Sequence, residues 1–292
     1  MRRRIRTVAV LPTMFTLGNL VCGFFAIVVA SRIEAPRSSA IPTAAEIEFS
    51  TVPTRLVQHL DRTDPTHNLM LCGWLIFLAM IFDALDGHVA RLTKASSDFG
   101  AQLDSLADLV TFGVAPAFLL VKMCPSFSFL HPQEIWIIAA LFAACAALRL
   151  ARFNIENAEE SDHMTFSGLP TPAAAAVMAG FAILSYTLRR ETSLLANRAS
   201  FDWWMQHLLP LFAVLVALLM VSRIPYPHVV NQVFRGQKSF GHVVKLLFAL
   251  VAVMVIRGYA VPLICSVFVL GPPLQYAWAL ARRKEIADEP LF

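Results

Sequence analysis

The sequence predicts an all-α protein, a polytopic transmembrane helix bundle with six core helices and a C-terminal helix pair. Of its 292 residues, 57% are hydrophobic and only 15% are charged, and the mean hydropathy is +0.63. A typical soluble domain has about 25% charged residues. The apolar residues are also grouped in long runs, which is what several helices need when each crosses about 30 Å of hydrocarbon.

Eight apolar runs reach or approach the length of a membrane-spanning helix, for which about 17 residues is the lower limit. They are Val8–Ala30, Leu69–Ala90, Gln102–Met123, Ile135–Arg152, Pro172–Leu188, Met205–Val221, Phe240–Ile256 and Val261–Ala281. The seventh is the weakest, because it contains Lys245 and barely reaches that limit. We therefore expect six core spans, followed by the last two runs as a C-terminal pair.

The first apolar run follows an arginine-rich start, an arrangement also found in cleaved signal peptides. The apolar core of a signal peptide has only about 7–15 residues, and this run continues well beyond that length. Gly18 and Gly23 within it suit close packing between helices. We interpret the run as a retained first helix.

Basic residues predict the orientation, because short basic segments stay on the cytoplasmic side. The chain begins Met-Arg-Arg-Arg-Ile-Arg, and Arg-Arg-Lys at 282–284 directly follows the last apolar run. An even number of spans places both ends on one side, so we expect a multi-pass protein with its second and fourth spans ending at the cytoplasm. In a bacterium this membrane would be the cell inner membrane. Arg189, Arg190 and Arg198 fall on the opposite side and weaken the pattern.

We expect a transmembrane core over 1–222 and a C-terminal part over 223–292, made of the last helix pair and a short basic tail. Within the core, the polar and proline-containing stretch 31–68 is interpreted as an extracytoplasmic loop insertion. The net charge of +4 agrees with this topology and with anionic lipid headgroups, and no nucleic-acid partner is expected. The five cysteines are scattered, which predicts neither a disulfide framework nor a zinc cluster.

Four carboxylates border the junction of the second and third spans. Asp83 and Asp86 lie three residues apart, and Asp104 and Asp108 lie four apart, so each pair shares one helical face. The polar turn between the two helices is short, which makes them antiparallel neighbours and lets the two faces meet. This junction is therefore where we expect the chemistry.

Four acidic groups at a membrane helix end would repel one another and be costly to desolvate without compensating charge. Two divalent ions would balance them, and ligation by oxygen alone suits Mg²⁺ or Mn²⁺ rather than zinc. A two-metal site of this kind can clamp a phosphoryl group and stabilise the attacking and leaving oxygens. The residues alone thus predict metal-dependent chemistry on a phosphorylated membrane substrate.

Small residues and one arginine accompany the carboxylates. Gly87, Ala90 and Gly100 lie on or beside the acidic faces, where a missing side chain lets a bulky substrate approach the backbone, and Arg91 can pair with pyrophosphate oxygens. Taken one at a time, these residues fit helix packing and the positive-inside pattern equally well. Taken together, the spacing Asp-x2-Asp-Gly-x2-Ala-Arg-x8-Gly-x3-Asp-x3-Asp is long and selective, and it favours a site.

This pattern resembles the signature of the CDP-alcohol phosphotransferase family, and every signature position matches. The wider context is most similar to the membrane-embedded members that act on CDP-diacylglycerol and serine, the phosphatidylserine synthases. The similar stretches are 17–23 (Leu-Gly-Asn-Leu-Val-Cys-Gly), 97–108, 148–154 (Leu-Arg-Leu-Ala-Arg-Phe-Asn) and 166–172 (Phe-Ser-Gly-Leu-Pro-Thr-Pro). The resemblance covers most of the first 180 residues.

The resemblance implies a cytoplasm-facing site, a homodimer, and transfer of the phosphatidyl group of CDP-diacylglycerol to the hydroxyl of L-serine, which gives phosphatidylserine and CMP. It implies that the four aspartates hold two metal ions and that Asp108 is also the base. It further implies that Gly87, Ala90, Arg91 and Gly100 contact the CDP-lipid.

A serine acceptor carries a carboxylate, so its pocket needs a cation. Arg149 and Arg152, at the cytoplasmic end of the fourth span, are the natural candidates, and anchoring of the span end is the alternative for both.

Two other functions compete with this interpretation. A related enzyme that uses glycerol 3-phosphate, inositol or choline would keep all four aspartates and differ mainly in the acceptor pocket. A transporter with an acidic ion site would carry its acids near the midplane, on broken helices within a repeated architecture. The sequence has no internal repeat, and its acids lie at helix ends.

Overall fold

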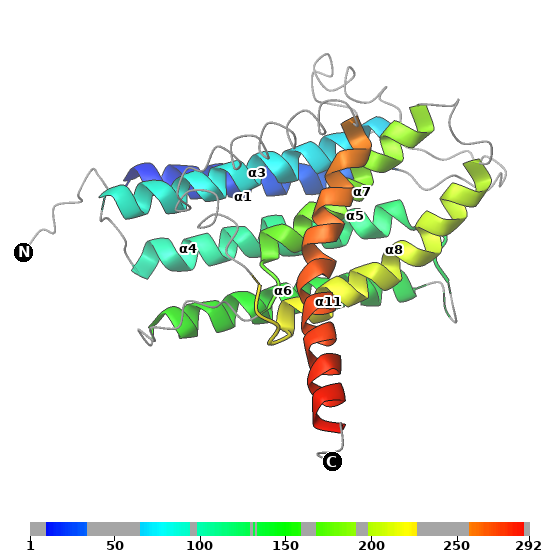
Figure 1. The fold of residues 1–292 in the computed structure, drawn as a ribbon. Coiled ribbons are helices and arrows are strands. Elements are labelled where there is room, and N and C mark those ends of the chain that lie inside the picture. Colours follow the sequence, from blue (N-terminus) through cyan, green and yellow to red (C-terminus); the bar gives the residue numbers. More distant parts are fainter. Residues whose placement is uncertain are drawn as a thin grey trace, which may run out of the picture.

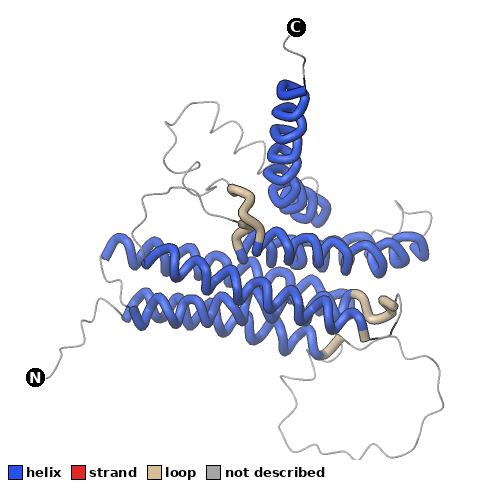
Figure 2. The backbone as a smooth tube through the Cα atoms, turned by 90° about the horizontal axis from the view of Figure 1, so that it is seen from below, coloured by secondary structure: helices blue, strands red, loops and turns tan. Residues whose placement is uncertain are grey.

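The computed structural model describes residues 10–33, 65–93, 98–128, 131, 133–158, 168–190, 198–226 and 257–288. Throughout these ranges the secondary structure is helical, with short connections and no β-strand (Figure 2). The all-α prediction is therefore confirmed.

Six helical stretches are long and apolar enough to cross a membrane, which confirms the six predicted core spans and makes this a multi-pass integral membrane protein. The elements that form them are α1 (Val10–Ser31), α3 (Pro65–Thr93), α4 (Asp98–Asp108) with η2 (Leu109–Val114) and α5 (Ala115–Met123), α6 (Glu134–Ala158), α7 (Thr171–Arg190) and α8 (Arg198–Val221). Several are longer than their apolar runs, because helices continue past the hydrocarbon into polar residues.

The third span is not a uniform α-helix. Between α4 and α5 the chain makes a π-helical turn, η2, directly after Asp108. Such turns contain one residue more than the α-helix would use and often occur at functional sites. Thr111, Phe112 and Gly113 within η2 are fully buried, so the wide turn lies inside the bundle.

Small residues let the spans pack closely. A Cβ on Gly73 of α3 would lie 2.8 Å from the carbonyl oxygen of Ala179 on α7 and 2.9 Å from Ile183 Cγ1. Ala179 itself lies in an alanine-rich stretch of α7 whose side chains are buried. Close backbone approach through small residues is the usual way in which helices associate in membranes, where lipid removes the hydrophobic driving force between them.

The C-terminal part differs from the core. The predicted seventh span, Phe240–Ile256, lies outside the described residues. The predicted eighth, Val261–Ala281, is helical and falls within α11 (Ala260–Asp288), but the apolar stretch of that helix, Ala260–Tyr276, is shorter than the core spans. Figure 1 shows α11, in orange and red, crossing the other helices at a steep angle. It is joined to the segment that follows α8, because the hydroxyl of Tyr226 donates a 2.9 Å hydrogen bond to the carbonyl of Val269.

The two ends of the bundle carry different side chains. Trp136 in the first turn of α6 and Trp203 and Trp204 in the second turn of α8 are about half exposed (54%, 54% and 53%). Exposed tryptophans near the ends of spans are typical of a membrane–water interface. Lys122 lies at this same end and donates to the carbonyls of Ser31, the last residue of α1, and of Ile33 just after it. The aspartates lie at the opposite end of the bundle.

Candidate functional site

Three of the four aspartates meet where α3 approaches α4. Asp83 of α3 and Asp104 and Asp108 of α4 each offer a carboxylate oxygen, and these oxygens lie within 4.8 Å of one another. Asp86 is buried beside them, close enough to interact directly with Asp104. The expected meeting of the two acidic faces is thus observed.

Asp86 is held by its own contacts. Its carboxylate accepts hydrogen bonds from the side chain of Thr16 on α1 and from the backbone N–H of Gly87. Thr16 is itself buried. The first span therefore forms one wall of the acidic site, which the spacing of the aspartates did not indicate.

Asn19 of α1 also belongs to the acidic site, although the sequence did not single it out. Its side chain is completely buried, and its Nδ2 donates a 2.9 Å hydrogen bond to Oδ1 of Asp108. The available signal was a carboxamide in the middle of the apolar first run, where a polar side chain is costly unless it has a partner.

The fourth span supplies the positive charge of the site. Arg149 of α6 lies close enough to Asp108 and Asp83 for electrostatic attraction, its Nη1 donates to Oγ1 of Thr171 at 3.4 Å, and its guanidinium lies over the Phe153 ring at 5.3 Å. Arg152, one turn further, instead donates from Nη1 to the carbonyl of Ser222 at 3.4 Å. The structure therefore places Arg149 beside the aspartates. The hydrogen bond of Arg152 is instead made to Ser222, directly after α8.

A polar contact connects α4 to α6 beside the aspartates. Nδ2 of Asn154 donates to Oγ of Ser105 at 2.9 Å, and the Ser105 hydroxyl also lies 3.1 Å from the carbonyl of Ala101. Ser105 follows Asp104 directly, so this contact fixes the rotation of α4 relative to Arg149's helix.

The end of α8 is joined to the start of α7 by a tight backbone contact. The N–H groups of Gly168 and Leu169 donate to the carbonyls of Ile224 (2.9 Å) and Leu219 (3.0 Å). Gly168 has a φ of +89°, and a Cβ there would lie 2.5 Å from the carbonyl oxygen of Met220. Glycine is required here, and the contact places Thr171 where it meets Arg149.

The donor atoms of the acidic site fit bound cations. Among the described residues, three buried side-chain oxygens or nitrogens have no hydrogen-bond partner: Oδ1 of Asn19, Oδ2 of Asp86 and Oδ1 of Asp104. All three are oxygens, and all belong to this one site. Buried polar atoms normally have partners, and an orphaned one calls for an explanation such as a bound ion. Hard divalent cations with several oxygen ligands match this set.

Four further predicted site residues flank the aspartates. A Cβ added to Gly87 would meet no atom within 4 Å, so the surface beside Asp86 is open at this point. Gly100 lies in the first turn of α4 and is partly exposed. Ala90 and Arg91 belong to α3, but their side chains fall outside what the structure describes.

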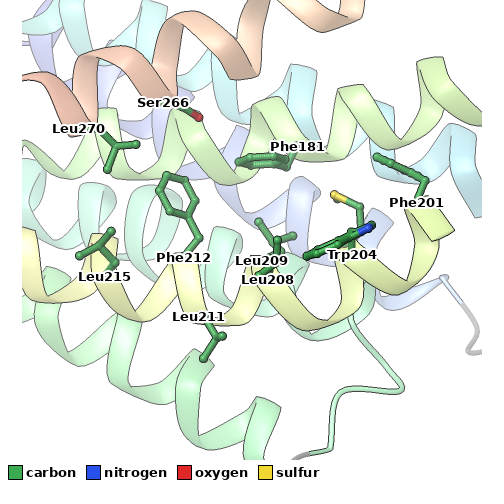
Figure 3. Close-up of a pocket in the computed structure, with 11 residues that line it drawn as sticks. Phe181, Phe201, Trp204, Leu208, Leu209, Leu211, Phe212, Leu215, Ser266 and Leu270 are labelled. Carbon is green, nitrogen blue, oxygen red and sulfur yellow. The ribbon is translucent and has the colours of Figure 1, made fainter.

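A separate cavity of about 620 Å³ lies between α7, α8 and α11. Figure 3 shows that its walls are apolar, with Phe181 from α7, Trp204 and Phe212 from α8, and Leu270 from α11. None of its lining side chains is ionisable or belongs to the acidic site. Ser266 contributes a hydroxyl to this lining, and the cavity can hold hydrocarbon.

Comparisons with known proteins give a consistent result. The model of the family described as CDP-alcohol phosphatidyltransferase matches residues 9–219. Proteins named CDP-diacylglycerol–serine O-phosphatidyltransferase are similar to this chain: that of Methanocaldococcus jannaschii is 43% identical over 55% of this chain and 65% of its own, and that of Helicobacter pylori is 37% identical over 56% of this chain and 63% of its own. The matched segment thus spans a little under two thirds of both relatives.

A third protein of the same name, from Bacillus subtilis, is 32% identical over 75% of this chain and 90% of its own. The family match covers α1 to α8 and therefore every residue of the acidic site. The chain belongs to the CDP-alcohol phosphatidyltransferase family.

Proposed function

We propose that this protein transfers the phosphatidyl group of CDP-diacylglycerol to the hydroxyl of L-serine, which yields phosphatidylserine and CMP. The observation that carries the proposal is the cluster of Asp83, Asp104 and Asp108 with Asp86 beside it, at one end of a membrane bundle. Oxygens of Asp86 and Asp104 in this cluster have no hydrogen-bond partner within the described part of the chain. Serine as acceptor is supported by the names of the relatives.

The four aspartates are proposed to hold two divalent ions, Mg²⁺ or Mn²⁺. When bound, such ions neutralise the pyrophosphate of the CDP-lipid and stabilise the charge that develops on departing CMP. Two doubly charged ions balance four carboxylates, and the nearby Arg149 adds positive charge. Gly87, Ala90, Arg91 and Gly100 are proposed to contact the CDP-lipid, and the open surface at Gly87 gives it room.

Asp108 is proposed as the general base, and it lies deeper than Asp83 and Asp104. It accepts the proton of the serine hydroxyl while the serine oxygen bonds to the phosphorus that carries the diacylglycerol. The bond from that phosphorus to CMP breaks, and CMP leaves with the electron pair. A base held within hydrogen-bond reach of the reacting hydroxyl typically accelerates such a step about 10²–10⁴-fold.

Arg149 is proposed to bind the serine carboxylate, since its guanidinium lies next to the acidic site. One of its N–H groups is engaged by Thr171, and a guanidinium has five N–H donors, so donors remain for a carboxylate. Arg152 also has donors beyond the one engaged by Ser222 and completes the proposed acceptor pocket. Its contact with the chain after α8 gives it a second role, in holding that wall of the pocket.

The site is proposed to face the cytoplasm, at the inner membrane if the source is bacterial, with the protein acting as a homodimer. The orientation rests on the basic residues near both chain ends, and the dimer on the resemblance to the family. The division into a core over 1–222, with an extracytoplasmic loop at 31–68, and a C-terminal part over 223–292 also remains a proposal. We propose the lipid bilayer, CDP-diacylglycerol and L-serine as the partners of this protein, and no nucleic acid.

The test is CMP release from CDP-diacylglycerol by purified protein with Mg²⁺ or Mn²⁺, comparing L-serine, glycerol 3-phosphate, inositol and choline. We expect release with serine only, and none after chelation. Release with another acceptor would correct the substrate, and no release with any acceptor from folded protein would refute the enzyme assignment, which would leave ion transport to be tested.

Asp108→Asn should abolish release while CDP-lipid binding persists. Asp202→Asn, on α8 at the opposite end of the bundle, is the matched control and should leave release unchanged. Near-normal turnover of Asp108→Asn would contradict the assignment of the base.

A further inference from the structure

The side chain of Asn19 is connected to Asp108 across a large sequence separation. Asn19 lies in α1 and Asp108 at the end of α4, 89 residues apart in the chain, yet the amide nitrogen is 2.9 Å from Oδ1 of the carboxylate. Asn19 is 0% exposed. This hydrogen bond is the direct link that the structure describes between the first span and the proposed base.

The position of Asn19 is fixed by its backbone as well. The hydroxyl of Thr111, in the π-helical turn, donates a 3.1 Å hydrogen bond to the carbonyl of Asn19. One turn further along α1, a Cβ on Gly23 would lie 2.8 Å from the Cα of Thr111. The two backbones therefore approach more closely than any residue with a side chain allows, and Asn19 has little freedom to move away from Asp108.

Packing alone does not account for an asparagine at this position. A leucine has a similar size and would be favourable in an apolar span, whereas a polar side chain at membrane depth is costly. The carbonyl oxygen Oδ1 of Asn19 has no hydrogen-bond partner among the described residues, and burying an unsatisfied acceptor is unfavourable. The contact of Asn19 with Asp108 explains an asparagine here better than packing does.

We propose that Asn19 is a positioning residue for Asp108, which holds the carboxylate in the one orientation that serves cation binding and proton transfer. The torsion that turns a carboxylate about its last bond is broad, so a carboxylate without a fixed partner samples many orientations. The amide of Asn19 donates to Oδ1 of Asp108. The lone pairs of Oδ2 of Asp108 are then left for the proposed ion or for the proton of the serine hydroxyl. The inference deepens the proposed function and rests on it.

The effect expected from losing Asn19 follows from the behaviour of groups that orient metal ligands. Removing such a partner typically lowers metal affinity or activity about 10–100-fold. The loss should fall on kcat and on cation affinity, because Asn19 does not itself contact the CDP-lipid in this proposal. The KM for CDP-diacylglycerol should therefore stay within about twofold.

The experiment compares Asn19→Leu with wild type in detergent. Mn²⁺ binding is measured by the electron paramagnetic resonance signal of the free ion, CMP release with serine gives kcat, and thermal unfolding gives Tm. We expect a Tm equal to or above that of wild type, with Mn²⁺ affinity and kcat about 10–100-fold lower. Asn68→Leu, a buried asparagine near the opposite end of α3, is the matched control and should alter neither Mn²⁺ affinity nor kcat.

A second variant covers the case in which Asn19→Leu folds poorly. Thr111→Val removes the hydroxyl that holds the Asn19 carbonyl and keeps nearly the same shape, so it should weaken Mn²⁺ binding in the same direction by a smaller factor. If Asn19→Leu folds and has wild-type Mn²⁺ affinity and kcat, the proposal is overturned. If Asn19→Leu does not fold, the same result from folded Thr111→Val overturns it. If the wild-type protein releases no CMP, the proposed function fails, and the Mn²⁺ titrations still decide the role of Asn19.

Discussion

Replacing Gly87 by alanine separates substrate binding from folding. Gly87 lies in α3 directly after Asp86, and a Cβ at this position would have no protein atom within 4 Å. The added methyl group therefore disturbs no contact in the described part of the fold. It would occupy the surface where the CDP-lipid is proposed to approach the backbone.

The two effects of Gly87→Ala have opposite signs. Alanine is favoured over glycine in a helix interior by roughly 0.5–1 kcal/mol, so the free energy of unfolding should rise slightly. In the complex, a methyl group forced into a fitted contact costs about 1–3 kcal/mol, which corresponds to about 5–150-fold weaker binding. The KM for CDP-diacylglycerol should increase by that factor, while Mn²⁺ affinity stays near that of wild type.

The assay measures CMP release against CDP-diacylglycerol concentration at saturating serine, together with Tm. Gly271→Ala in α11 is the control, because a Cβ there also meets nothing within 4 Å and the position is far from the aspartates in sequence and on another helix. Its KM should match wild type. A Gly87→Ala enzyme with an unchanged KM for the lipid would refute the idea that this open surface receives the substrate.

Three further outcomes are expected. Gly168→Ala should lower the free energy of unfolding by at least about 2 kcal/mol in thermal unfolding, since its φ of +89° is unfavourable for alanine and its Cβ would lie 2.5 Å from the Met220 carbonyl oxygen. Arg149→Lys should raise the KM for serine about tenfold and Arg152→Lys less, because a planar guanidinium binds a carboxylate through two hydrogen bonds; equal serine KM values for both variants and wild type would exclude this pocket. Tyr226→Phe should cost about 1 kcal/mol of stability. Burial raises the pKa of Tyr226 to about 12, against about 10 in the unfolded chain, so its contribution should be complete below pH 10 and decline as pH rises toward 12, which a series of Tm values would show.

The sequence was sufficient for the six spans and for the meeting of the acidic faces. Both the spans and the acidic faces depend on local sequence patterns. A long apolar run indicates a membrane span, and a spacing of three or four residues indicates a shared helical face. Asp83 and Asp104 needed only a short connection between their helices to come together. The seventh run, Phe240–Ile256, stays a prediction.

The sequence was not sufficient for contacts that depend on how α1 is rotated against α4. The hydrogen bond from Asn19 to Asp108 joins distant parts of the chain, and an apolar helix gives little indication of which face turns inward when lipid and protein are equally apolar. The different contacts of Arg149 and Arg152 were not predicted either. Their spacing places them on one face, but long side chains reach along the helix in different directions, and their partners Thr171 and Ser222 come from other elements.

The π-helical turn after Asp108 has a consequence for how this protein can change over evolution. One residue of an α-helix corresponds to a rotation of about 100°. A single-residue insertion or deletion in a regular part of the third span would turn Asp104 and Asp108 by that angle relative to α5. The wide turn at Leu109–Val114 already absorbs one extra residue, so loss of that residue would restore a regular helix and leave the carboxylates facing Asp83. The third span can therefore change its length by one residue at this turn, whereas a length change in the regular helix between the aspartates and α5 would separate the carboxylates.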